Sequence, residues 1–257
     1  RGLAVCASSA LFPLCISSRS ARSAAIKQGF IERKLSPYFA PLDHQMVRCE
    51  LCPHECEVGP GERGLCEVRE NTNGQYYSLV YANPCAVHID PIEKKPLFHF
   101  HPGSTAFSIA TAGCNFRCSF CQNADISQMP RVRGQILGHQ ATPQAVVRAA
   151  QRSGSQSIAY TYTEPTIFFE YAYDSARLAS QAGIRNVFVT NGYMTPEMLE
   201  TIGQDLHAAL RRGGVSWADQ QAALRRAGIE DRGAGLGEAL FERILERASG
   251  TLISVQE

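Results

Sequence analysis

Residues 106–123 read AFSIATAGCNFRCSFCQN, a short apolar run followed almost at once by three cysteines. The first six residues, Ala106–Thr111, are rich enough in β-formers to predict a buried strand. The cysteines that follow, Cys114, Cys118 and Cys121, are separated by three and then by two residues. Three thiolates can hold one metal centre, and an iron–sulfur cube with three protein ligands keeps one iron open for chemistry. A zinc knuckle is the alternative, although zinc sites tend to pair their ligands two by two.

Strand and helix patterns alternate after this point. Two further strands are predicted at Ser157–Tyr162 and Asn186–Thr190, and a helix is predicted at Phe168–Gln181. Thr142-Pro143 and Thr195-Pro196 each supply an N-cap and a first-turn proline for a helix. This alternation predicts a parallel sheet with right-handed crossovers. In such sheets and barrels ligands bind at the carboxyl ends of the strands.

Composition excludes some functions for the 257-residue chain. Its 25 basic and 24 acidic side chains give a formal charge of +1, without the basic excess typical of a nucleic-acid binder. No stretch reaches the roughly 20 apolar residues that span a bilayer as a helix. We therefore expect neither a nucleic-acid partner nor a membrane partner. Ten cysteines are the outlier, and seven of them lie in two clusters.

Four segments together resemble a known family. They are Asp90–Ser104 (DPIEKKPLFHFHPGS), Cys114–Asn123 (CNFRCSFCQN), Tyr160–Tyr171 (YTYTEPTIFFEY) and Val189–Tyr193 (VTNGY). The spacing of the cysteines is similar to that of the radical S-adenosylmethionine (SAM) superfamily, and the segments resemble the AmmeMemoRadiSam-system radical SAM enzyme. That group is related to pyruvate formate-lyase activating enzymes. The resemblance covers residues 29–209.

The resemblance implies an α/β fold, a partial (β/α) radical SAM barrel, and an enzyme. Cys114, Cys118 and Cys121 would bind a 4Fe-4S cluster, and SAM would chelate its open iron. The reduced cluster would cleave SAM reductively to methionine and a 5′-deoxyadenosyl radical that abstracts hydrogen from a substrate. The implied partners are a one-electron reductant such as flavodoxin or ferredoxin and, for an activase that installs a glycyl radical, a protein substrate.

The resemblance also assigns roles to residues at the strand ends. Phe120 would line the adenine pocket, and Glu164 would meet the charged amino end of SAM. Thr190, Asn191 and Gly192 would contact the ribose. Two of these roles have a plainer alternative: Glu164 also suits the start of the following helix, and the Asn-Gly pair also suits a simple turn.

A first cysteine cluster precedes this region. Its members are Cys49, Cys52, Cys56 and Cys66. Four thiols are a complete set for tetrahedral zinc or for an iron–sulfur cube, with no position left open. His54 could replace one ligand, and disulfides are the alternative if the chain is exported. The segment Glu93–Lys95, with His99 and His101, is interpreted as a solvated basic corner, a substrate-side patch being the alternative.

The sequence predicts four parts. Residues 1–25 are interpreted as a remnant of a leader, because Leu3–Ile16 is apolar and small residues follow it. Residues 26–104 form the Cys-rich segment and residues 105–209 the radical SAM core. Residues 210–257 form an atypical helical tail, with helices predicted at Ser216–Ala227 and Glu238–Ala248.

Two open questions follow from these parts. The barrel pattern stops after the third strand, as in a truncated or frame-shifted gene product or a divergent helical ending. A three-stranded remnant would leave a sheet edge uncovered. The alternative function is therefore a non-enzymatic iron–sulfur or zinc-binding protein, or an inactive radical SAM fragment. We expect a cytoplasmic location, with export by a twin-arginine-type leader as the alternative.

Overall fold

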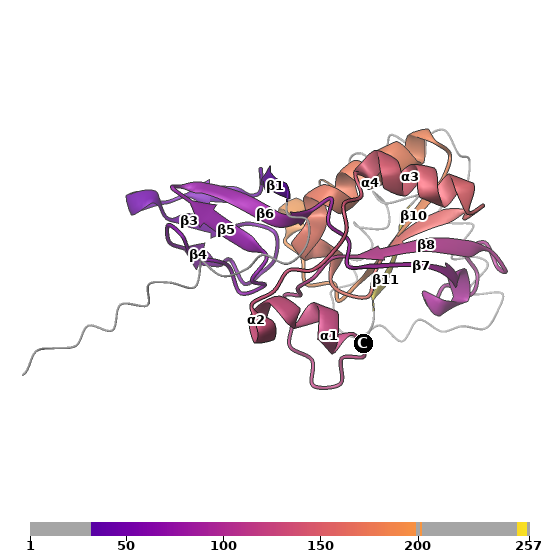
Figure 1. The fold of residues 1–257 in the computed structure, drawn as a ribbon, viewed down its shortest axis with the longest axis horizontal. Coiled ribbons are helices and arrows are strands. Elements are labelled where there is room, and N and C mark those ends of the chain that lie inside the picture. The colour runs from indigo at the N-terminus through magenta and orange to yellow at the C-terminus, as the bar shows by residue number, and fades with distance from the viewer. Residues whose placement is uncertain (1–31, 199–200, 202–250, 256–257) are drawn as a thin grey trace, which may run out of the picture.

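The computed structural model describes residues 32–198, 201 and 251–255, which form an N-terminal all-β part and an α/β part (Figure 1). The α/β part is built on one five-stranded sheet in the order β11-β10-β9-β8-β7. Its strands are β7 (Ala86–Pro91), β8 (Thr105–Ala110), β9 (Ser157–Tyr160), β10 (Arg185–Thr190) and β11 (Thr251–Val255).

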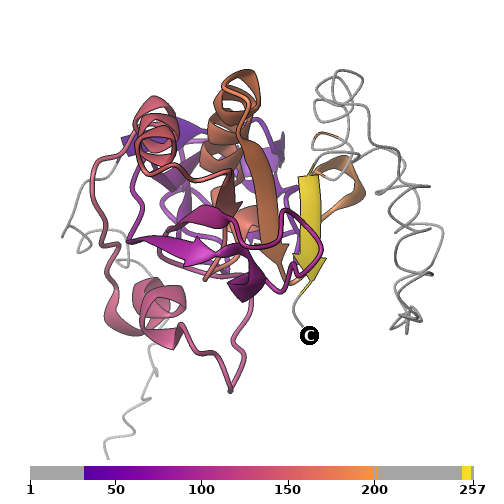
Figure 2. The same cartoon turned by 90° about the vertical axis from the view of Figure 1, so that its right-hand side faces the viewer.

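The three predicted strands are present, and they pair in parallel as β8, β9 and β10. Two strands were not predicted as members of this sheet. β7 pairs antiparallel with β8 and comes from the segment assigned to the Cys-rich part. β11 pairs in parallel with β10, so the parallel strands do not end with the third (Figure 2, yellow strand). The proposed leader (1–25) and both predicted tail helices lie outside the described residues.

The crossover helices begin where capping residues predict. α3 (Pro143–Arg152) starts after Thr142, whose hydroxyl accepts a hydrogen bond from the backbone N–H of Ala145 at 3.2 Å. A short 3₁₀ helix, η3 (Pro165–Phe168), leads into α4 (Phe169–Gln181). α3 and α4 lie together on one face of the sheet (Figure 1). Two short helices, α1 (Ala124–Ser127) and α2 (Met129–Arg133), follow the cysteine loop.

The N-terminal part consists of two small antiparallel sheets. One has the order β1-β6-β5 and the other β2-β3-β4. Their strands are β1 (Glu32–Leu35), β2 (Phe39–Pro41), β3 (Val47–Cys49), β4 (Glu57–Val58), β5 (Arg69–Thr72) and β6 (Gln75–Tyr81). Single 3₁₀ turns are formed by η1 (Asp43–Gln45) and η2 (Ile92–Lys94).

The three central strands of the sheet, β8, β9 and β10, are buried on both faces. Phe107, Ile109, Tyr160 and Phe188 belong to the large core that includes α3 and α4. On the other face, Ala106, Ala159, Val187 and Val189 pack against Ile92 and Leu97 from the segment after β7. Burial on both faces explains the nearly continuous apolar runs of these strands. No helix among the described residues is long and apolar enough to cross a membrane.

A buried ion pair joins the two parts. Arg69 of β5 donates from Nη1 to Oε1 of Glu170 at 2.9 Å and from Nη2 to Oε2 at 2.5 Å. Arg69 Nε also donates to the carbonyl oxygen of Ile167 at 3.1 Å. Burial raises the pKa of Glu170, but the charge and hydrogen bonds of Arg69 outweigh it and hold this pKa below its usual value. Each of the two buried charges is therefore stabilised by the other.

Replacing one member of this pair should destabilise the fold strongly. We expect Arg69→Met to lower the free energy of unfolding by about 3–5 kcal/mol, because it leaves an uncompensated buried carboxylate. Urea titration followed by circular dichroism measures this. The matched control is Lys34→Met, which removes the exposed 3.7 Å pair with Asp174 and should cost at most about 1 kcal/mol. Equal losses of stability in the two variants would contradict the conclusion that Arg69 and Glu170 form a stabilising buried ion pair.

Candidate functional site

The three-cysteine motif lies in the irregular loop between β8 and α1. Cys114 and Cys121 are half-buried, Cys118 is exposed, and all three thiols are free. The Cys114 sulfur accepts a hydrogen bond from the backbone N–H of Phe116 at 3.4 Å, and the Cys121 sulfur lies 3.4 Å from the Ser127 hydroxyl. A thiolate needs such donors, so the polar surroundings of the loop fit a metal-bound state.

The thiols of this loop are not gathered around a common point. Among residues 32–198, 201 and 251–255, no three His, Cys, Asp or Glu side chains are placed so that they could hold a metal ion. The donor chemistry of the loop nevertheless fits an iron–sulfur cluster with three cysteine ligands. Because the loop has no regular secondary structure, the thiols can be gathered without breaking a helix or strand.

Glu164 occupies the loop that follows β9 and joins the ends of two strands. Its side chain is 2% exposed. Oε1 accepts hydrogen bonds from the backbone N–H and the hydroxyl of Thr166, at 3.0 and 2.6 Å, and from the Thr190 hydroxyl at 2.7 Å. Oε2 accepts one from the backbone N–H of Asn191 at 2.8 Å. Burial raises the pKa of Glu164, and these hydrogen bonds partly offset that effect.

Asn191 extends this connection to the cysteine loop. Its side-chain amide donates to Oδ1 of Asn115 at 2.9 Å, and Asn115 in turn donates to the carbonyl oxygen of Tyr193 at 3.3 Å. Asn115 directly follows Cys114 in the sequence. The ends of β8, β9 and β10 are therefore joined by one hydrogen-bonded chain, as expected for the ligand-binding edge of a parallel sheet.

The structure brings together most of the predicted SAM-contact residues, but not all. Glu164, Thr190 and Asn191 are hydrogen-bonded to one another, and the Gly192 backbone N–H donates to the Thr190 hydroxyl at 3.1 Å. The alternative for Glu164 is also present, because its side chain caps η3. Phe120 is 75% exposed, so its adenine contact stays a prediction. Sequence reasoning missed Asn115, whose position beside a cysteine was the available signal.

The prediction that Glu93–Lys95 form a solvated basic corner is wrong for Lys95. Lys95 is 2% exposed and lies 2.7 Å from Oδ2 of Asp90, with its ammonium 4.4 Å from the centre of the Tyr162 ring. Burial raises the pKa of Asp90, but hydrogen bonds from Lys95, Tyr162 and Lys94 outweigh it and lower this pKa well below its usual value. The burial of Lys95 was not predicted, because a lysine is buried only when it has specific acidic and aromatic partners, and those partners are not visible in the sequence.

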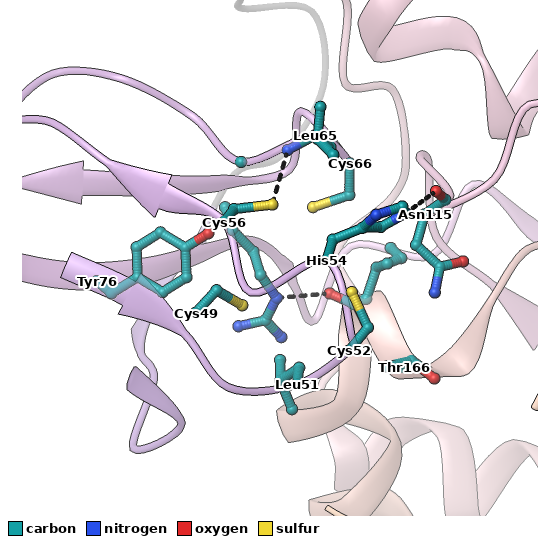
Figure 3. Close-up of a pocket in the computed structure, with 13 residues that line it drawn as sticks. Cys49, Leu51, Cys52, His54, Cys56, Leu65, Cys66, Tyr76, Asn115 and Thr166 are labelled. Atoms are coloured by element: carbon teal, nitrogen blue, oxygen red, sulfur yellow. Dashed lines mark hydrogen bonds between the residues drawn. The ribbon is translucent and has the colours of Figure 1, made fainter. Parts of the chain in front are cut away.

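The first cysteine cluster lines a pocket between the two parts of the fold (Figure 3). We call it the four-cysteine pocket, after Cys49, Cys52, Cys56 and Cys66. All four thiols are free, so the structure does not contain the disulfides that were the alternative for this cluster. Burial raises the pKa of the Cys52 thiol to about 11 and that of Cys66 to about 12.

The four-cysteine pocket also touches the cysteine loop. His54 Nε2 lies 3.0 Å from the carbonyl oxygen of Asn115, and the His54 ring packs against Tyr193 at 5.0 Å. On the same side, the Thr195 hydroxyl donates to the carbonyl oxygen of Glu50 at 2.6 Å. His54 therefore connects the two cysteine clusters, a role that its neighbours in the sequence did not indicate.

Comparison with known proteins agrees with this arrangement. Residues 108–208 match the family described as the Radical SAM superfamily. The match supports membership of that superfamily. It begins within β8 and ends at residue 208, so it includes the cysteine loop, Glu164 and Asn191. The four cysteines of the four-cysteine pocket lie before the match, whereas Asn115, Thr166 and Ile167, which also line this pocket, lie within it.

Two relatives are named, and neither has a described activity. The uncharacterized protein MJ0808 of Methanocaldococcus jannaschii is 46% identical over 168 residues, which are 65% of this chain and 50% of that protein. The uncharacterized protein MJ0674 of the same organism is 30% identical over 122 residues, 46% of this chain and 31% of that protein. The chain thus spans half or less of the relatives it matches. No solved structure matches it.

Removing one oxygen of Glu164 should weaken the strand-end connection. In Glu164→Gln the amide –NH₂ group must face either the Asn191 N–H or the donors of Thr166 and Thr190, and it can accept from none of them. We expect a loss of about 1–3 kcal/mol in the free energy of unfolding, measured by urea titration. The exposed control Glu197→Gln should stay within about 0.5 kcal/mol of the wild type. A loss no larger than this control would refute the connection.

The thiol of Cys114 should react slowly at neutral pH. Burial raises its pKa to about 11, so below that pH its thiolate fraction, and with it the alkylation rate, should rise about tenfold per pH unit. Mass spectrometry of iodoacetamide labelling in the metal-free protein between pH 7 and 10 measures this. The exposed Cys118 should be labelled first at pH 7. A rate at Cys114 that does not change with pH would mean that the thiolate already predominates.

Proposed function

We propose that the chain is a radical SAM enzyme that binds a 4Fe-4S cluster through Cys114, Cys118 and Cys121 and cleaves SAM reductively. The observation that carries the proposal is the hydrogen-bonded chain from Glu164 through Asn191 to Asn115. It brings the polar ends of β9 and β10 against the loop that carries the three thiols. When bound, the reduced cluster supplies the electron that splits SAM into methionine and a 5′-deoxyadenosyl radical.

The residues of the chain would then have distinct tasks. The three thiols would hold the cluster after losing their protons. Glu164 would fix the two strand ends, and through them the groups of Asn191 and Gly192 that face the ligand. The buried sheet beneath the site would keep water from the radical.

The finer assignment rests on the resemblance alone. We propose an AmmeMemoRadiSam-type enzyme related to the activases of glycyl-radical enzymes. Its electrons would come from a one-electron carrier such as flavodoxin or ferredoxin, and its substrate would be a protein or a small molecule.

Formation of 5′-deoxyadenosine tests the proposal. The purified full chain is reconstituted anaerobically with iron and sulfide, reduced with dithionite and given SAM, and the product is quantified by chromatography. We expect wild type to form 5′-deoxyadenosine. Each of Cys114→Ala, Cys118→Ala and Cys121→Ala should abolish it, because a cube with two remaining protein ligands is not held.

The control is Cys85→Ala, which removes a half-buried free cysteine outside both clusters and should leave product formation unchanged. Iron uptake by wild type without SAM cleavage would contradict the proposal and would favour a non-enzymatic iron–sulfur protein. Equal activity in wild type and the three cluster variants would contradict the ligand assignment.

A further inference from the structure

The four-cysteine pocket holds a second feature that a simple thiol cluster does not explain. The hydroxyl of Tyr76 is buried and has no hydrogen-bond partner among the described residues. Tyr76 itself is fully buried and lines the pocket together with the four cysteines (Figure 3). Buried hydroxyls are normally satisfied, so an orphaned one calls for a partner that the protein atoms do not supply.

Gly64 shows how closely this hydroxyl lies to the sulfurs. A Cβ added at Gly64 would come within 2.8 Å of the Tyr76 hydroxyl oxygen and 3.7 Å of the Cys56 sulfur. The hydroxyl therefore lies beside the Cys56 thiol at the inner wall of the pocket. A thiolate there would accept its proton in a hydrogen bond, whereas a neutral thiol is a weak acceptor.

The lining of the pocket points to a closed site. Its four thiols are a complete set of ligands and leave no coordination position open for chemistry. Zinc with four cysteine ligands is the usual closed, tetrahedral arrangement for a structural site.

We propose that the four-cysteine pocket is a structural zinc site that fixes the segment 49–66 against the cysteine loop of the radical SAM site. The four thiols line the pocket without converging as ligands, so binding includes their inward rotation. Zinc there would hold the ends of the segment that carries His54, and His54 contacts Asn115 of the cysteine loop. This inference goes beyond the proposed function, and it stands even if SAM is not cleaved.

Metal analysis separates the two sites. The triple variant Cys114→Ala/Cys118→Ala/Cys121→Ala is expressed as the full chain with zinc and iron supplied, purified anaerobically and analysed by plasma mass spectrometry. We expect about one zinc per chain. Adding Cys52→Ala and Cys66→Ala should remove it, whereas adding Cys85→Ala should not.

Two outcomes would overturn the proposal. The triple variant could hold no metal, or it could hold about four irons with sulfide, as a cube would require. Because this variant lacks the radical SAM cysteines, the result is independent of whether the wild type cleaves SAM.

A second measurement applies if the variant with all five cysteine substitutions fails to fold. Cobalt is bound to the triple variant in place of zinc, and the visible spectrum of the bound cobalt should show tetrahedral thiolate coordination. Tyr76→Phe should keep this spectrum but weaken zinc binding roughly tenfold or more in competition with a chelator, since it removes the hydrogen bond to a ligand sulfur. The neighbouring control Tyr77→Phe should not weaken it. An octahedral cobalt spectrum, or equal affinities of the two tyrosine variants, would contradict the proposal.

Discussion

The buried carboxylate of Glu164 is the constraint on which the site depends. A carboxylate at this depth is costly unless its oxygens accept several hydrogen bonds, and here four donors surround it. Those donors come from η3, which follows β9, and from the end of β10 and the residue after it, so satisfying one side chain fixes the relative position of two strand ends. The Asn191–Asn115 contact then carries the same constraint to the loop after β8.

The N-terminal part takes part in this arrangement. Arg69 reaches across to Glu170 at the start of α4, directly after the 3₁₀ helix that Glu164 caps. His54 of the same part contacts Asn115 in the cysteine loop. The cysteine loop is therefore held between two parts of the chain, and the segment 49–66 supports the candidate site without belonging to the matched domain.

Much of the central region could be predicted from sequence, because its signals are local. The apolar run before Cys114 and the Thr142 cap each determine the structure of residues close to them in the sequence. The strand β8 and the start of α3 were therefore predicted correctly. Contacts between distant segments could not be predicted: β7 and β11 join the sheet through long-range pairing. Lys95 was misinterpreted for the same reason, since the partners that allow its burial are brought to it by the fold.

The most direct test of the central claim is electron paramagnetic resonance of the reconstituted, reduced full chain, recorded without and with SAM. If the cysteine loop and the strand ends joined by Glu164 form one SAM-binding site, the spectrum of the reduced cluster should change on addition of SAM. That change should be lost in Asn191→Ala, in which the link to Asn115 is removed. A cluster signal that SAM leaves unchanged in the wild type would show that the loop binds iron and sulfide without a SAM site.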